Sequence, residues 1–338
     1  MTHFVTNPLA RFGVEVDYDL SRPLDPEGAA ALRELLYREK LLVFHDQLLS
    51  EAQQRGVLEH FCRTLPPDED HRDLSLEGYV GRCALAYHGD VMFVDDPYRV
   101  LSLYALDIDE DSGTATRFAN AALAAARLPA ELRDTVATMT TTVVFPPHVS
   151  RREMSYDMPS FLPRYTRPVL WPHPVTGEEV LFIFELYTSR IEGLAEPESD
   201  ALLEKLFAHL YAEDAIQEHV WRTGDIVIWD NMSLQHGRTE QLTAKRRELR
   251  RIVAAEKSMF AQCPQFDPTN PEFLEWTKGR REIEIPAVIG ASLCWLSEPH
   301  VTAAKELPGL RKRRRLSGCC SALDARLFDS ACSQARFS

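Results

Sequence analysis

The stretch ALAYHGDVMF, residues 84–93, sets a histidine and an aspartate in an otherwise apolar run. In a β-strand, residues two apart project to the same face, so His88 and Asp90 would point one way and Gly89 the other. A histidine beside an acid is often a satisfied core pair, because buried polar groups nearly always have hydrogen-bond partners. The pair can also be two metal ligands, one imidazole and one carboxylate. That second interpretation requires a third ligand elsewhere in the chain.

A candidate third ligand lies in WRTGDIVIWDNMSLQHGRTE, residues 221–240. Residues 226–229 are predicted to form a strand, and His236 follows where a loop or the next strand would direct it back at the sheet. Two imidazoles and one carboxylate make the facial triad of non-haem iron(II) enzymes, which leaves positions of the metal open. Open positions allow chemistry at the metal.

An arginine-rich segment, AKRRELRRIV, follows this histidine at residues 244–253. If the segment is a strand, Arg247 and Arg251 share one of its faces. An arginine fork holds a carboxylate through two parallel hydrogen bonds. The pair therefore suits an anionic guest, such as a dicarboxylate cosubstrate that chelates the metal at its other end.

The composition excludes several classes of function. The 338 residues are 45% apolar and 26% charged, as in ordinary globular proteins. The net charge of -13 argues against a nucleic-acid surface, which carries a basic stripe. Neither a signal peptide nor a membrane span of about 18 apolar residues is visible. We expect a cytoplasmic protein that acts on a small molecule, with no nucleic acid or membrane as partner, and we leave homo-oligomerisation open.

The seven cysteines, without a CxxC pair, are predicted to be free thiols.

Helices and strands are predicted to alternate irregularly along one domain. Helices are expected at residues 26–40, 50–64, 120–139 with a break at Pro129, and 198–213. Strands are expected at 41–45, 100–108, 140–145, 224–231 and 248–256, and a turn followed by a strand within 177–186. The segment 146–168 mixes prolines, charges and aromatic residues without a period, which predicts a long loop or lid. We expect a single domain over 1–285 and a basic, poorly ordered extension over 286–338.

These motifs carry a family resemblance. The sequence resembles the taurine dioxygenase-like family of iron(II)/2-oxoglutarate-dependent oxygenases, which includes the 2,4-dichlorophenoxyacetate dioxygenases, from about residue 8 to 256. The order and spacing of the motifs support it: GVEVDYDLSRPL, LLVFHDQLLS, YHGDVMF, GTATRFAN, HPVTGEEVLF and WRTGDIVIWDNMSLQH. The resemblance implies a mainly β member of the α+β class, with a double-stranded β-helix (a cupin-like jelly roll) and flanking helices.

The resemblance also implies roles for individual residues. His88, Asp90 and His236 fall on the iron ligands of the family. Thr116 and Arg247 fall on residues that hold 2-oxoglutarate. Arg251 falls on a second arginine, which faces the anionic end of the substrate in taurine-type members; we group it with the cosubstrate-binding residues and leave the division of work with Arg247 open.

The sequence also departs from the family pattern. Tyr87 replaces the usual tryptophan and Gly89 the usual threonine, which alters the pocket wall but not the ligation. The presence of Asp90 favours oxygenation over halogenation. The histidine and tyrosine that contact taurine have no counterpart at matching spacing, since His71 and Tyr79 are too close to the first ligand. Taurine is therefore not the expected substrate.

The implied reaction uses iron(II), 2-oxoglutarate and O2. Oxidative decarboxylation gives succinate and carbon dioxide while a substrate C–H bond is hydroxylated, or the substrate is desaturated or cyclised. We expect no catalytic side chain beyond the iron centre. The candidate substrate contacts, Tyr87, Asn231, Arg152 and Arg164, would suit a carboxylate-bearing or amino-acid-derived metabolite, in specialised biosynthesis or catabolism.

Two other functions fit part of this pattern. A zinc-type hydrolase uses two histidines and an aspartate with an activated water, but gives Thr116 and the arginine pair no task. A non-catalytic β-barrel that binds a small acid explains the arginines, but not an intact set of metal ligands.

Overall fold

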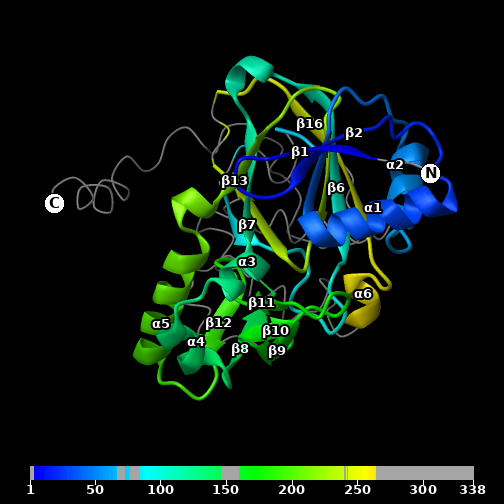
Figure 1. Cartoon of the computed structure of the whole chain (residues 1–338). Helices are drawn as coiled ribbons and strands as arrows, with labels where there is room; N and C mark the ends of the chain where they lie inside the picture. The colour runs from blue at the N-terminus through cyan, green and yellow to red at the C-terminus, as the bar shows by residue number, and fades with distance from the viewer. Residues whose placement is uncertain are drawn as a thin grey trace, which may run out of the picture. The chain divides into compact units, whose positions relative to one another are not determined.

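A seven-stranded sheet forms one wall of the protein (Figure 1). The computed structural model describes residues 4–66, 73–76, 82, 84–145, 160–239, 241 and 243–263. In spatial order the sheet contains β1 (Val5–Pro8), β2 (Val14–Asp17), β3 (Leu41–Phe44), β14 (Ile226–Asp230), β6 (Val100–Ile108), β16 (Arg247–Ala254) and β4 (Asp73–Leu74). Neighbouring strands are antiparallel except β2 and β3, which are parallel.

A four-stranded antiparallel sheet carries both candidate histidines. Its order is β13 (Gln217–Val220), β7 (Ala115–Asn120), β15 (Leu234–Arg238) and β5 (Leu85–His88). His236 on β15 lies in register with His88 on β5 and with Phe118 on β7. The pairing places two imidazoles opposite each other on adjacent strands.

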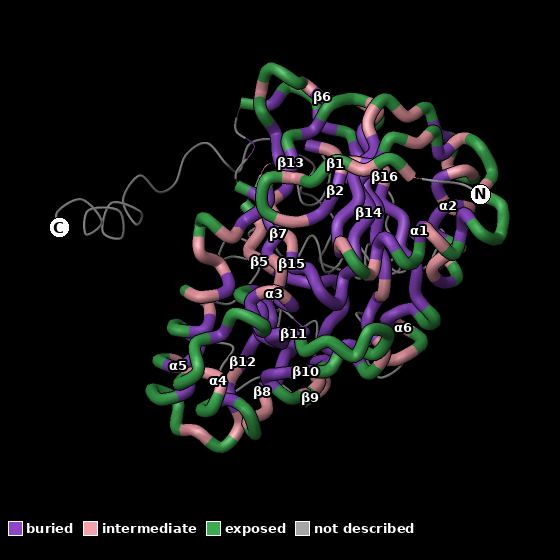
Figure 2. The backbone as a smooth tube through the Cα atoms, in the orientation of Figure 1, coloured by how far each residue is buried: buried purple, intermediate pink, exposed green. Residues whose placement is uncertain are grey.

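The space between these two sheets is the main core. Alternate residues of the large sheet, such as Val227 and Trp229 on β14, join Phe118 and Leu234 of the small sheet in one buried cluster. The other face of the large sheet packs against helices α1 (Pro26–Glu39) and α2 (Glu51–Glu59), where Leu36 is fully buried with Ile228. Figure 2 shows this buried interior running through the strands. The period-two alternation of the strands thus separates a face toward the helices from a face toward the other sheet.

Most of the remaining elements lie around two smaller sheets in the lower part of Figure 1. They are the strand set β12 (Thr188–Ile191), β8 (Thr140–Val144) and β9 (Arg164–Pro168), the pair β10 (Leu170–Pro172) and β11 (Glu179–Leu181), and helices α3 (Ala121–Ala126), α4 (Ala130–Val136) and α5 (Glu196–Leu210). Two 3-10 turns, Glu110–Ser112 and Glu213–Ala215, and α6 (Met259–Gln262) complete the described elements. No described helix is both long and apolar enough to span a membrane.

The bounds of some elements differ from the expectations. The predicted helix 50–64 ends at Glu59, and within 177–186 only Glu179–Leu181 is a strand. Arg164–Pro168, in the segment expected to be a loop or lid, forms the strand β9 and pairs with β8. Of the rest, residues 146–159, including Arg152, lie outside the described residues, as does the extension 286–338. The expected break at Pro129 is confirmed, since it separates α3 from α4.

Candidate metal and cosubstrate site

The three predicted ligands come together between the sheets. One ligand atom from each of His88, Asp90 and His236 lies within 4.8 Å of the other two, and they form the only such group of three among the described residues. Asp90 Oδ1 is 3.5 Å from His88 Nε2 and 3.8 Å from His236 Nε2. The strand β5 ends at His88, so Asp90 reaches the site from the following turn and not from the strand itself. The sequence argument placed His88 and Asp90 on one strand, which is wrong for Asp90. The closeness of the two side chains that it predicted is confirmed.

Each histidine has a ring nitrogen available for a metal. The carbonyl oxygen of Ala86 lies 2.8 Å from His88 Nδ1 and accepts a hydrogen bond from it, so the Nε2 atom of His88 carries the lone pair and faces Asp90. Burial lowers the pKa of His236 to about 3, with further lowering by His88. His236 is therefore neutral near pH 7, the state in which imidazole ligates a metal.

The Asp90 carboxylate is held by Arg251 on its far oxygen. Arg251 donates to Asp90 Oδ2 from one terminal nitrogen at 2.5 Å and from Nε at 3.2 Å. Burial alone would raise the pKa of Asp90, but Arg251 and the two histidines hold it well below its usual range. Arg251 donates its hydrogen bonds to Oδ2 of Asp90, and Oδ1 faces the two histidines.

Asn231 fixes the turn that carries Asp90. Its Oδ1 accepts a hydrogen bond from the Asp90 amide at 2.8 Å, and its Nδ2 donates to the carbonyl oxygens of Asp90 and Tyr98. The next residue, Val91, has φ of 57°, an unusual value for a β-branched residue. This strained turn is buried, and Asn231 is one group that holds it in place.

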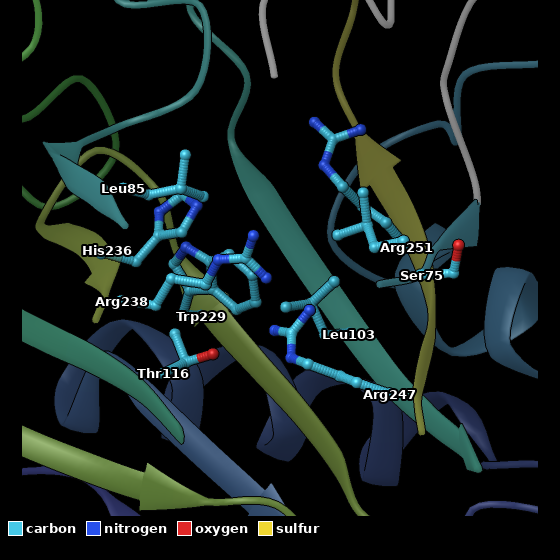
Figure 3. Close-up of a pocket in the computed structure, with 11 residues that line it drawn as sticks. Ser75, Leu85, Leu103, Thr116, Trp229, His236, Arg238, Arg247 and Arg251 are labelled. Atoms are coloured by element: carbon cyan, nitrogen blue, oxygen red, sulfur yellow. The ribbon is translucent and has the colours of Figure 1, made fainter. Parts of the chain in front are cut away.

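A pocket opens beside His236, with about 490 Å³ of empty space when the open solvent at its mouth is included (Figure 3). The small sheet supplies Leu85, Thr116, His236, Gly237 and Arg238, and the large sheet with the segment after β4 supplies Leu74, Ser75, Leu103, Trp229, Arg247 and Arg251. Arg247 is 4% exposed, and its Nε has no hydrogen-bond partner within the described part of the chain. Burial first, and then the charge of Arg238, hold the pKa of Arg247 below its ordinary value. A buried guanidinium with an unpaired N–H favours the binding of an anionic ligand.

The residues fit an octahedral metal. The donor set of two imidazoles and one carboxylate is that of the facial triad, and cis ligand atoms about 2 Å from a metal are separated by roughly 3 Å. The observed separations of 3.5 and 3.8 Å need only a small contraction. His236 Nδ1 is buried without a hydrogen-bond partner among the residues the structure describes. No described hydrogen bond at Nδ1 therefore holds the ring in an orientation that would oppose metal binding.

Two predicted substrate contacts have other tasks. Tyr87 points away from the pocket and stacks on Tyr211 beyond the end of α5, with ring centroids 4.5 Å apart, because it alternates with His88 along β5. Asn231 uses both ends of its side chain on backbone groups, as described above. The substrate roles of Tyr87 and Asn231 stay predictions. Arg164 is on β9 and is not among the residues that line the described pocket.

Sequence reasoning missed part of the pocket. Arg238 was not singled out, although it is two residues after His236 and therefore on the same face of β15. Trp229 lines the pocket, and Trp221 Nε1 donates to Thr116 Oγ1 at 3.0 Å. The period of two could have found Arg238, but no local signal indicates the tryptophan contacts.

Comparisons with known proteins identify the class. Residues 6–253 match the family described as taurine catabolism dioxygenase TauD, TfdA family. The chain is 28% identical over 270 residues to an alpha-ketoglutarate-dependent sulfate ester dioxygenase of Pseudomonas putida, covering 74% of this chain and 88% of that protein. It is 27% identical over 291 residues to the alpha-ketoglutarate-dependent 2,4-dichlorophenoxyacetate dioxygenase of Cupriavidus pinatubonensis, covering 75% and 97%. The crystal structure of a taurine dioxygenase from Burkholderia xenovorans superposes with a TM-score of 0.64 at 26% identity, over 75% of this chain and 91% of that one.

Fold and site together define a non-haem iron(II) dioxygenase that depends on 2-oxoglutarate and O2. The chain belongs to the TauD/TfdA family, and the family resemblance inferred from the motifs is confirmed.

Proposed function

We propose that the protein oxidises a C–H bond of a small, carboxylate-bearing or amino-acid-derived metabolite, with His88, Asp90 and His236 holding the iron. When bound, iron(II) activates O2 together with 2-oxoglutarate, which becomes succinate and carbon dioxide as the substrate is hydroxylated, desaturated or cyclised. The observation that carries the proposal is the cluster of three ligand atoms beside a pocket with a buried, unpartnered Arg247 Nε in the described chain.

The chain's own residues prepare the site. The Ala86 carbonyl and Arg251 orient two of the ligands, so Nε2 of His88 and Oδ1 of Asp90 face the metal position. Thr116 and Arg247 would bind the carboxylate of 2-oxoglutarate remote from the metal. Leu85 and Leu103 form apolar pocket walls that exclude water from the reacting groups.

The finer aspects of the architecture belong to the same proposal. The two main sheets, with the core between them, support a double-stranded β-helix. We propose a single oxygenase domain over 1–285, followed by a separate extension. For the substrate, the name of one relative specifies 2,4-dichlorophenoxyacetate, a carboxylate, which agrees with the class proposed here.

Succinate release tests this function. Purified protein with iron(II), 2-oxoglutarate and O2 is screened against small carboxylic acids, each paired with its neutral amide. We expect succinate formation that needs all three components, increases with a carboxylate, and is lost in His236→Ala. His60→Ala, a half-buried histidine outside the site, is the matched control and should retain activity.

The screen also separates the alternatives. A zinc-type hydrolase would act without O2 and without 2-oxoglutarate, and a non-catalytic binding protein would form no succinate with any acid. Amides that work as well as the acids would contradict the proposed substrate class while leaving the reaction type intact. The similarity to dioxygenases favours neither alternative.

A further inference from the structure

A buried histidine joins the hairpin of β10 and β11 to the end of β14. His173 directly follows β10 and is 1% exposed, and Asp230, the last residue of β14, is fully buried. His173 Nε2 lies 3.2 Å from each carboxylate oxygen of Asp230. Neither residue is among the three metal ligands or the residues that line the described pocket. This contact therefore needs an explanation outside the metal and cosubstrate site itself.

The hairpin determines which nitrogen of His173 carries a hydrogen. The backbone amides of Val175 and Thr176 both donate to Nδ1 of His173, each at 3.1 Å. Because a backbone amide can only donate, Nδ1 holds the lone pair of the ring and Nε2 carries the N–H. His173 therefore donates to Asp230, from a ring that the hairpin turn holds in one orientation.

Asp230 organises the turn between β14 and β15. Its Oδ1 accepts a hydrogen bond from the Met232 amide at 3.1 Å, and its Oδ2 accepts one from the Ser233 hydroxyl at 2.5 Å. A buried carboxylate is costly unless donors surround it, so these bonds and the bond from His173 support one another. Without the N–H of His173, the carboxylate and the turn bonded to it would be free to change orientation.

This turn, residues 230–233, leads to two of the three metal ligands. Asn231 lies in the turn and bonds to both the amide and the carbonyl oxygen of Asp90. The strand β15 begins at Leu234, directly after the turn, and carries His236. Metal ligands must be held within a fraction of an ångström of their working positions. A small shift of the turn would therefore disturb both ligands.

We propose that His173 is a positioning residue of the metal site and acts through Asp230. By donating to this carboxylate it fixes the turn 230–233, and the turn sets both Asn231 and β15 in place. The inference rests on the proposed function, because it assigns His173 a role toward the iron site. It predicts that iron(II) binds more weakly when this bond is lost, although all three ligands are intact.

Two substitutions separate this role from a role in the hairpin alone. His173→Gln can place an amide N–H near the position of Nε2, which keeps the donor to Asp230 but removes the acceptor for the two hairpin amides. His173→Asn can place its amide oxygen near the position of Nδ1, which keeps that acceptor, but its side chain is too short to donate to Asp230. Positioning through Asp230 predicts that glutamine preserves metal binding, whereas a role confined to the hairpin predicts that asparagine does.

Anaerobic titration of the metal-free protein with iron(II) tests the inference without turnover. We expect His173→Asn to weaken iron(II) binding about tenfold, as is typical for groups that orient metal ligands, and His173→Gln to bind within about threefold of wild type. The control is Ser199→Ala, which removes the buried acceptor of the Ile191 amide on another part of the fold. This variant should lose stability in urea denaturation but bind iron(II) within about twofold of wild type.

The possible results answer separate questions. The inference is overturned if His173→Asn binds iron(II) within about twofold of wild type, or if His173→Gln binds no better than His173→Asn. Either result leaves the proposed function standing, whereas a wild-type protein that binds no iron(II) would contradict the proposed function itself. If His173→Asn does not fold, Ser233→Ala decides the question, because it removes another donor to Asp230. Iron(II) binding about threefold weaker in that variant supports the inference, and unchanged binding overturns it.

Discussion

At the scale of single residues, the site depends on side chains that hold the ligands as much as on the ligands. Asn231 makes three hydrogen bonds to backbone groups of Asp90 and Tyr98 while 1% exposed. A metal ligand in a strained turn needs such support, since the turn residue Val91 has a positive φ. Asn231 is a positioning residue of the proposed iron site.

Asn231→Ala should lower both stability and metal affinity. The substitution leaves buried backbone groups unpaired, so we expect a loss of about 2 to 3 kcal/mol in the free energy of unfolding. Iron(II) binding should weaken about tenfold or more as Asp90 loses its fixed orientation. Urea denaturation and metal titration measure the two effects. Unchanged metal affinity in a destabilised variant would show that the turn does not need Asn231 to hold the ligand.

Arg251→Met should destabilise the metal-free protein more than the metal-loaded protein. Removing Arg251 leaves the buried Asp90 carboxylate without its cation, at a cost of about 3 kcal/mol, and a bound metal replaces that charge. Thermal unfolding with and without Mn(II) measures the difference, with exposed Arg246→Met as control. Equal destabilisation in both states would argue against charge compensation by the metal.

The sequence predicted the ligands but not their surroundings. His88, Asp90 and His236 were found from their types and order, and Arg247 from the arginine-rich segment after the last ligand and from the family resemblance. Asn231 was assigned to substrate because nothing local shows that its amide bonds to a turn 141 residues earlier. Tyr87 was assigned to the pocket although the period of two, applied strictly, places it opposite His88.

At the scale of elements, the close approach of β15 and β5 sets the distance between the two histidines. Gly237 lies beside Leu85, and a Cβ built on Gly237 would be 2.8 Å from the Leu85 carbonyl oxygen. Real Cβ atoms do not approach this closely, so any side chain there displaces β5, which ends in His88.

Gly237→Ala should therefore weaken metal binding. We expect a loss of about 1 to 3 kcal/mol in stability from overpacking and a clear loss of iron(II) affinity. The matched control is Gly56→Ala in the interior of α2, where a Cβ meets nothing within 4 Å. That variant should gain about 0.5 to 1 kcal/mol from helix propensity and bind metal normally. Normal metal affinity in Gly237→Ala would show that the strands accommodate the side chain without moving His88.

Elements with a strong local signal were predicted well, and those fixed by tertiary pairing were not. The helix at 26–40 is observed as Pro26–Glu39, with Asp25 as N-cap and Lys40 in a left-handed conformation. The helix predicted over 50–64 ends at Glu59 because the chain then turns to pair with β16, where the Leu65 amide bonds to the Val253 carbonyl. The strand β9 carries an alternating burial pattern that prolines and charges concealed in the sequence.

At the scale of the whole molecule, a polar cluster around the buried Asp225 connects separate strands outside the metal site. Asp225, which is 1% exposed, lies 2.6 Å from His45 Nδ1 and 3.1 Å from His219 Nε2, and Glu15 is 3.5 Å from the other side of His45. The hydrogen bond to Asp225 raises the pKa of His45. Although burial opposes the shift, the histidines lower the pKa of Asp225 to about 2.

This cluster predicts a dependence of stability on pH. A raised folded-state pKa of His45 contributes stability that is present below about pH 6.5 and is lost as the pH rises through the folded value. A lowered pKa of Asp225 contributes stability that is present above about pH 4 and is lost toward pH 2. We therefore expect His45→Gln to cost about 1 kcal/mol at pH 5.5 and much less at pH 9, as measured by urea denaturation. An equal cost at both pH values would contradict a charged His45.

The central claim is that His88, Asp90 and His236 hold iron(II) so that 2-oxoglutarate chelates it. The most direct measurement adds iron(II) and 2-oxoglutarate to the metal-free protein without oxygen and records the weak visible charge-transfer band of the chelate. We predict a band in wild type that is abolished in His236→Ala, weakened in Arg247→Ala and retained in His60→Ala. A well-folded wild-type protein that shows no band would contradict the account, because these three residues would then form a structural cluster or hold another metal.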